Sequence, residues 1–176
     1  MNQTLPPTEQ TGPLADLDQR GIAELTHAMH LQNGAVQNAI EKALPALIEF
    51  LEVLVPRMRK GGRLFYLGAG TSGRLGIIDA SECPPTFGVS PDTVIGLIAG
   101  GDGALRVAIE GAEDNVDAAW TDLSSFHPNA TDTVVGIAAS GRTPYVLGGL
   151  KKSRAEGLLT ACITCNPKSA AEEASE

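Results

Sequence analysis

The 176-residue chain lacks several features that mark well-known classes of protein. It contains no stretch of about 18 apolar residues that would span a bilayer, and residues 1–12 carry no basic segment followed by an apolar one. Basic residues are fewer than acidic ones, and the net charge of −8 gives no long-range attraction for nucleic acid or an anionic membrane. We therefore expect a soluble, cytoplasmic protein that binds a small molecule, with no nucleic acid and no membrane as partner.

Cysteine is also scarce, and its spacing does not indicate a metal or redox site. Three cysteines, an odd number, do not make a disulfide framework. Cys162 and Cys165 lie in or beside a predicted strand, on which residues three apart point to opposite faces, and no second cysteine pair completes a zinc site. His27 and His30 have no acidic or cysteine partner on their predicted helix. We expect free cysteines and no metal.

Composition and apolar periodicity divide the chain into three regions. Residues 1–17 carry three prolines among polar side chains and are expected to form an extended arm. Residues 18–60 show apolar side chains at helical spacing, which predicts two successive helical stretches. Pro45 and Pro56 lie in this pattern, and each is expected to kink the helix or to start a new one. Residues 61–176 are expected to form an α/β domain.

Four aliphatic runs alternate with helical segments in this third region. They lie near residues 63–67, 93–99, 133–139 and 158–164. Continuous Val, Ile and Leu runs are typical of strands buried on both faces, and their alternation with helices favours a doubly wound parallel sheet. The carboxyl ends of all strands in such a sheet lie at one edge. A flavodoxin-like strand order makes the first and third strands neighbours, so the loops that follow them are expected to meet.

Two loops rich in glycine and hydroxyl residues follow the first and third predicted strands. One reads Gly-Ala-Gly-Thr-Ser-Gly-Arg over residues 68–74, the other reads Ser-Gly-Arg-Thr over residues 140–143, and each opens a helical segment. Unpaired N–H groups and the positive end of the helix dipole make such junctions anion sites, and the hydroxyls suit a phosphomonoester. The candidate binding residues are Gly70, Thr71, Ser72, Gly73, Ser140, Gly141, Arg142 and Thr143. Thr143 is also expected to cap the helix that Pro144 begins.

Gly68-x-Gly70-x-x-Gly73 also matches the dinucleotide fingerprint, which raises an oxidoreductase as an alternative. About 20 residues further on, where an acidic residue should end the second strand and bind the ribose, the chain reads Pro-Asp-Thr over 91–93 and is only entering that strand. Asp102 follows the strand too late for this role. The sequence has no Gly-Lys-Ser/Thr, which excludes the phosphate loop of nucleotide hydrolases. An ordinary tight turn at each junction is the structural alternative.

Glu82 and Glu113 are the candidate catalytic acids. Glu82 stands just before Pro84-Pro85, on backbone that is expected to be rigid and unable to continue a helix, so its carboxylate can be aimed. Glu113 lies downstream of the second strand in Glu-Gly-Ala-Glu-Asp, whose other acids are interpreted as solvated surface charges. From spacing alone, a structural cap or a surface acid remains an alternative for each glutamate.

Four segments of the sequence closely resemble the motifs of a known family. They are Leu-Gly-Ala-Gly-Thr-Ser-Gly-Arg-Leu-Gly over 67–76, Asp-Ala-Ser-Glu-Cys-Pro-Pro-Thr-Phe-Gly over 79–88, Glu-Gly-Ala-Glu-Asp over 110–114 and Ala-Ser-Gly-Arg-Thr-Pro-Tyr over 139–145. The chain resembles the N-acetylmuramic acid 6-phosphate etherases, which belong to the sugar isomerase (SIS) superfamily together with the glucokinase regulatory protein. The resemblance implies a carbon–oxygen lyase of amino-sugar catabolism and peptidoglycan recycling. That enzyme cleaves the D-lactyl ether of N-acetylmuramate 6-phosphate without metal or nucleotide cofactor.

The resemblance also implies roles for particular residues. Glu82 corresponds to the proton donor to the leaving lactate, and Glu113 to a second essential acid that is suited to remove the C2 proton. Ser72, Ser140 and Thr143 correspond to the phosphate clamp. The family's site is built at a homodimer contact, and its longer members have a further strand and a C-terminal helical region that this chain lacks. A non-catalytic sugar-phosphate-binding regulator of the same superfamily is the alternative function.

Overall fold

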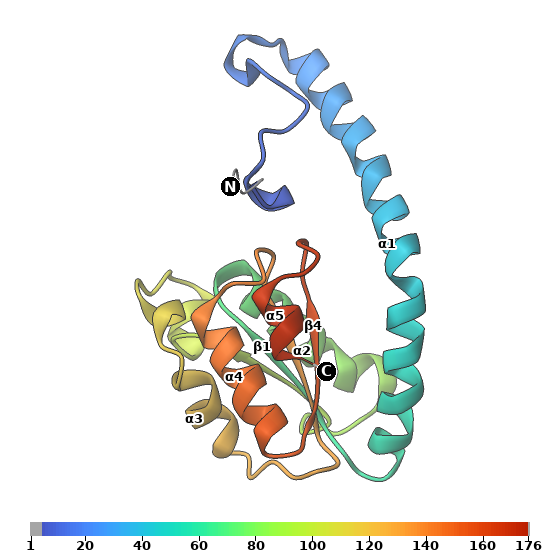
Figure 1. The fold of residues 1–176 in the computed structure, drawn as a ribbon, viewed down its shortest axis with the longest axis vertical. Helices are drawn as coiled ribbons and strands as arrows, with labels where there is room; N and C mark the ends of the chain where they lie inside the picture. Colours follow the sequence, from blue (N-terminus) through green and yellow to red (C-terminus); the bar gives the residue numbers. More distant parts are fainter. Residues whose placement is uncertain (1–4, 176) are drawn as a thin grey trace. The chain divides into compact units, whose positions relative to one another are not determined.

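The computed structural model describes residues 5–175. The chain divides into two compact units, Met1–Val53 and Leu54–Glu176. The first unit holds most of the long helix α1 (Ile22–Arg59), and the second holds all the strands and the remaining α-helices (Figure 1). The candidate site lies within the second unit.

Helix α1 differs from the two helical stretches that the sequence predicts. It is one continuous helix of 38 residues, so the expectation of a new helix at Pro45 or Pro56 is wrong. A proline inside a helix loses one hydrogen bond and costs about 3 kcal/mol, but its φ is helical, and the turns on both sides maintain the helix. Leu17–Gln19 forms a separate 3-10 turn, so α1 begins later than predicted.

The amino-terminal arm is described only in part. Residues 5–17 contain one 3-10 turn, Pro7–Glu9, and are otherwise mostly without regular structure up to the turn that begins at Leu17. The extended arm predicted over residues 1–17 stays a prediction, and residues 1–4 lie outside the described residues.

The predicted parallel sheet is confirmed. Its strands are β1 (Leu64–Gly68), β2 (Val94–Ile98), β3 (Thr133–Ile137) and β4 (Leu159–Ile163), each within about one or two residues of the predicted run. All pairings are parallel, and the order is β2-β1-β3-β4. The first and third strands are therefore neighbours, as a flavodoxin-like order requires.

Helices cover both faces of the sheet, which makes the domain doubly wound. The helices are α2 (Gly70–Phe87), α3 (Ala118–Ser124), α4 (Pro144–Ala155) and α5 (Ala170–Ala174). Close approaches at glycines show which helix lies on which face. A Cβ on Gly76 of α2 would meet Tyr66 of β1, whereas a Cβ on Gly136 of β3 would meet Val146 of α4. Because side chains alternate along a strand, positions 66 and 136 of these registered strands face opposite sides.

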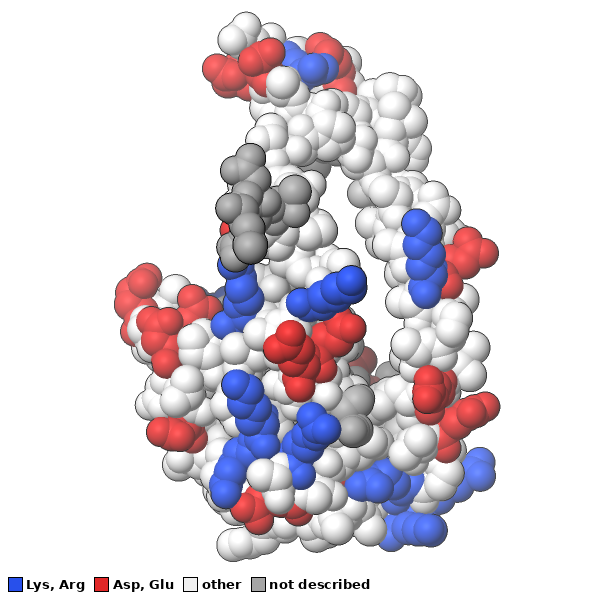
Figure 2. All heavy atoms as spheres, viewed as in Figure 1, with Lys and Arg blue, Asp and Glu red and all other residues white. Residues whose placement is uncertain are grey.

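The core lies between the sheet and α3 and α4. Phe65, Leu67, Val134, Val146 and Leu150 are all fully buried there. Figure 2 shows basic and acidic side chains interspersed over α4 and α5 on the face in view. A bound anion must therefore be held by local groups rather than by a broad positive field.

Candidate active site

The two predicted loops leave adjacent strands at the same edge of the sheet. β1 ends at Gly68 and β3 at Ile137, and these two residues are partners in the parallel register. Helix α2 begins two residues after β1, and α4 begins at Pro144, close after β3. The topology thus brings both hydroxyl-rich segments to the carboxyl edge, where ligands bind in open α/β sheets.

Glycines in the first loop permit a very close contact between helix and strand. A Cβ on Gly68 would lie 2.5 Å from the backbone nitrogen of Gly73, and a Cβ on Gly73 would lie 2.5 Å from Ile98 Cγ1. Gly70 adopts φ +53°, a conformation that other residues rarely take. The first turn of α2 contains Thr71 and Ser72, and its leading N–H groups have no intrahelical acceptor. This turn therefore has the geometry of an anion site.

The second loop is a tight turn whose hydroxyls remain accessible. The N–H of Gly141 donates to Ala138 O at 2.9 Å, and the N–H of Arg142 donates to Ser140 Oγ at 3.2 Å. Thr143 is the N-cap residue of α4, with Pro144 at the first helical position, as predicted. Its side chain makes no capping hydrogen bond, which departs from the expectation. The Thr143 hydroxyl is consequently not committed to the helix end.

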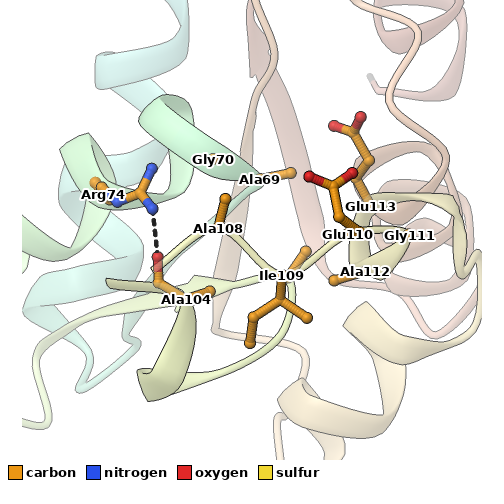
Figure 3. A pocket seen from close by; sticks show the side chains of 11 residues that line it. Ala69, Gly70, Arg74, Ala104, Ala108, Ile109, Glu110, Gly111, Ala112 and Glu113 are labelled. Carbon is orange, nitrogen blue, oxygen red and sulfur yellow. Dashed lines mark hydrogen bonds between the residues drawn. The ribbon is translucent and has the colours of Figure 1, made fainter. Parts of the chain in front are cut away.

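A pocket of about 190 Å³ lies beside the start of α2 (Figure 3). Ala69, Gly70 and Arg74 line one side, and the segment after β2 contributes Glu110 and Glu113. Both carboxylates are drawn on the same side of the pocket in Figure 3. The structure thus brings Gly70 and Glu113 together. It also adds Glu110, which the sequence analysis interpreted as a solvated surface charge, whereas Ser72, Ser140 and Thr143 are not among the lining residues.

Arg74 joins the two walls of this pocket. Its Nη2 donates to Ala104 O at 2.6 Å (Figure 3), and its Nε donates to Leu105 O at 2.9 Å. These bonds tie the loop after β2 to the first turns of α2. Its guanidinium also adds positive charge to the side of the pocket that Gly70 lines. Arg74 ends the first loop motif but is not one of the candidate binding residues predicted from the sequence.

Glu82 lies elsewhere on the chain. It is exposed on α2 and stands 12 residues after Gly70, which is about 18 Å along the helix axis. It does not line the pocket, so one chain does not bring Glu82 and Glu113 together there.

The expectation that Pro84 and Pro85 cannot continue the helix is wrong, because α2 runs through both to Phe87. Each proline lacks the N–H that would donate to the carbonyl four residues back, but its φ is helical, and the N–H of Gly88 closes the last turn on Pro84 O at 2.9 Å.

The described part of the chain has neither a metal-binding cluster nor a membrane-spanning helix. Within residues 5–175, no three or more His, Cys, Asp and Glu side chains are grouped so that they could hold a metal ion. Cys83, Cys162 and Cys165 are free thiols. None of the helices that the structure describes is both long enough and apolar enough to cross a membrane.

Comparisons with known proteins define the class. Residues 46–154 match the family model of the glucokinase regulatory protein N-terminal SIS domain, so the chain belongs to this SIS-domain family. Solved phosphoheptose isomerases from Neisseria gonorrhoeae and Francisella tularensis share the fold, each with a TM-score of 0.65, at 17% and 14% identity. The first alignment covers 82% of this chain and 75% of that one, and the second covers 89% and 81%.

Curated relatives identify a narrower group than the SIS-domain family does. Each relative described here is named N-acetylmuramic acid 6-phosphate etherase. The protein from Bacteroides thetaiotaomicron is 51% identical over 92% of this chain and 58% of its own length. The Christiangramia forsetii protein is 50% identical over 100% and 64%, and the Exiguobacterium protein is 57% identical over 85% and 51%. The predicted resemblance is confirmed. The chain spans between 51% and 64% of the length of these relatives.

Proposed function

We propose that this chain carries the sugar-phosphate site of an enzyme that cleaves the D-lactyl ether of N-acetylmuramate 6-phosphate. The products are N-acetylglucosamine 6-phosphate and D-lactate, and the enzyme is a carbon–oxygen lyase of cytoplasmic amino-sugar catabolism. One observation carries the proposal: a chain about half identical to etherases places Glu113 in a pocket at the anion-binding start of α2. No metal or cofactor is required by the reaction described below.

The phosphate is bound at the carboxyl edge of the sheet. Free N–H groups in the first turn of α2 and the positive end of the helix dipole face this edge, which favours a dianion. Hydroxyls of Ser72, Ser140 and Thr143 donate hydrogen bonds to its oxygens. Arg74 adds positive charge at the pocket wall. A sugar anchored by its phosphate extends its carbon chain into the pocket that Glu113 lines.

The carboxylates then catalyse an elimination followed by addition of water. In the ring-opened sugar the aldehyde acidifies the C2 proton, which Glu113 removes as a general base. The C2 electron pair forms a C2–C3 double bond, the C3–oxygen bond breaks, and the lactyl oxygen leaves with a proton supplied by an acid. Water then adds to the unsaturated aldehyde: its hydroxyl bonds to C3, its proton restores the acid, and Glu113 returns a proton to C2. We assign the proton donor as Glu82, by the motif that it shares with the etherases.

In this proposal, the Glu82 that serves the pocket of one chain comes from a second copy of the chain. Its distance of about 18 Å along α2 from Gly70 leaves the site incomplete within one chain. Leu75 and Ile78 lie on the same helical face as Glu82, at spacings of seven and four residues, and are 56% and 58% exposed. This exposed apolar face beside Glu82 is typical of a surface that another protein covers. The proposed enzyme is therefore a homodimer.

Substitution of the pocket glutamates tests the assignment of the base. Glu113→Gln is expected to lower D-lactate release from N-acetylmuramate 6-phosphate by at least about 100-fold, because an amide does not accept the C2 proton. Glu110→Gln is the matched control, since it removes a charge from the same pocket, and it should retain most of the activity. D-lactate is measured with a coupled dehydrogenase assay. Equal activity in Glu113→Gln and the unchanged chain would contradict the assigned base.

A sugar-phosphate-binding regulator without catalysis is the second candidate. It is favoured by one observation, that the matching family model describes a domain of a regulatory protein. A regulator needs the phosphate loops but not the acids. Binding of N-acetylglucosamine 6-phosphate together with no release of D-lactate from the etherase substrate would support it. Absence of both binding and release would contradict both proposals.

A further inference from the structure

The loop Ser140–Thr143 and the residue before it accept hydrogen bonds from the segment that follows β4, residues 165–171. Three successive carbonyl oxygens, those of residues 139–141, all accept hydrogen bonds from that segment. The donors are the N–H of Cys165 at 3.0 Å, Nδ2 of Asn166 at 3.0 Å and the N–H of Ala171 at 2.9 Å. Asn166 is the only side-chain donor among these three bonds.

Asn166 is well placed to determine the conformation of this loop. It is buried, with 3% of its surface exposed, and its own N–H donates to Thr164 Oγ1 at 3.2 Å. Loop and segment are in close contact at Gly141, where a Cβ would lie 2.4 Å from Ser169 Cβ. Gly141 also has φ +66°, so the loop conformation depends on this packing.

The direction of these bonds matters for an anion. A carbonyl oxygen that points at a phosphate repels it, whereas N–H and O–H groups attract it. Because these three carbonyl oxygens bond to the segment after β4, they are not available to face a ligand, and the hydroxyls of the loop can do so. Ser140 Oγ accepts from the N–H of Arg142, so its own hydrogen can be donated outward. We infer that Asn166 is a positioning residue for the phosphate loop, acting through the Ser140 carbonyl. This inference rests on the proposed function of that loop.

Binding of N-acetylglucosamine 6-phosphate, the product in the proposed reaction, tests the role of Asn166. In Asn166→Ala the affinity measured by calorimetry is expected to fall about tenfold, which corresponds to the loss of one positioning hydrogen bond. Unphosphorylated N-acetylglucosamine should bind the variant and the unchanged chain equally. Asn129→Ala is the matched control, because it also removes an asparagine Nδ2 donor, in this case to Asp132 Oδ2, ahead of β3 at the opposite edge. Unchanged affinity in Asn166→Ala would overturn the inference.

Asn166→Asp distinguishes the hydrogen bond to Ser140 O from simple packing of the side chain, because the substitution keeps the side-chain size but removes the N–H donor. At neutral pH its carboxylate would face Ser140 O without a proton to donate. Once protonated, the acid can donate that hydrogen bond again. The Kd of Asn166→Asp divided by that of the unchanged chain should therefore fall as the pH is lowered from about 7 toward the pKa of an aspartic acid, about 4. A ratio that does not change with pH would overturn the inference.

Amide hydrogen exchange distinguishes failure of this inference from failure of the proposed function. It needs no ligand, because the N–H groups of Cys165 and Ala171 themselves report the bonds to the loop. Faster exchange at both in Asn166→Ala, with other core amides unchanged, would support the positioning role even if no sugar phosphate binds. Unchanged exchange at both amides would overturn it.

Discussion

At the scale of single residues, Arg63 and Asp132 show how the amino-terminal edge of the sheet is stabilised. Asp132 is fully buried, and its Oδ2 lies 2.7 Å from Arg63 Nη2. The backbone N–H groups of Arg63 and Asn129 also donate to the carboxylate, at 2.8 and 2.9 Å. Burial opposes ionisation, but the hydrogen bonds from Arg63 and from the two N–H groups lower the pKa of Asp132 overall. The ionised form is thus stabilised by folding.

Asp132→Asn is expected to lower the free energy of unfolding by about 3 kcal/mol at neutral pH, because it leaves Arg63 without its carboxylate. Since the folded pKa of Asp132 is lowered, this contribution is present above its unfolded pKa of about 3.9 and is lost as the pH falls through the folded value. Urea denaturation at neutral and acidic pH measures both effects. Asp102→Asn, at an exposed aspartate, is the control and should change stability little. A stability difference between Asp132→Asn and the unchanged chain that is the same at every pH would contradict this account.

At the scale of secondary-structure elements, the close contact of α2 with β1 and β2 defines the site. Gly73→Ala would place a Cβ 2.5 Å from Ile98 Cγ1 and 2.8 Å from Gly68 O, so the start of α2 must move. The variant is expected to lose about 1–3 kcal/mol of stability and to bind sugar phosphate more weakly.

Gly34→Ala is the control, because a Cβ on Gly34 in α1 meets nothing within 4 Å and should raise helix stability by up to about 1 kcal/mol. Thermal denaturation followed by circular dichroism should therefore show Tm changes of opposite sign. A Tm for Gly73→Ala equal to that of the unchanged chain would contradict the predicted steric conflict.

At the scale of the whole molecule, the proposed homodimer predicts a doubled mass. Many large apolar side chains along α1 are between 41% and 85% exposed; examples are Ile22, Met29, Val36, Ile40, Leu44 and Leu47. Exposed apolar surface of this extent is typical of association sites. Sedimentation should give about twice the chain mass of 18.2 kDa.

Replacement of Ile40 and Leu47 by lysine should dissociate the dimer, whereas Gln37→Lys on the same helix should not. A monomer at every concentration of the unchanged chain would count against the homodimer, and with it against the proposed delivery of Glu82.

Much of the α/β domain follows from local patterns in the sequence. Four buried strands are recognisable from aliphatic runs, and the two loops from glycine and hydroxyl residues at strand–helix junctions. Continuity of α1 through Pro45 and of α2 through Pro84 is not recognisable, because a proline penalty of a few kcal/mol is outweighed by the surrounding turns and packing. Helix propensities describe only the local cost of a proline, and they omit the stabilisation that packing supplies.

The sequence by itself determined the parallel α/β class, the position of both loops and the presence of Glu113 after the second strand, because these depend on short-range periodicity and residue type. Only the tertiary structure decided that Glu113 shares a pocket with Arg74, that Glu82 lies far along α2, and that Asn166 holds the second loop. These relations join residues that are between 12 and 39 positions apart in the chain. Chain crossing and side-chain packing bring such residues together or keep them apart, and no local pattern in the sequence records that distance.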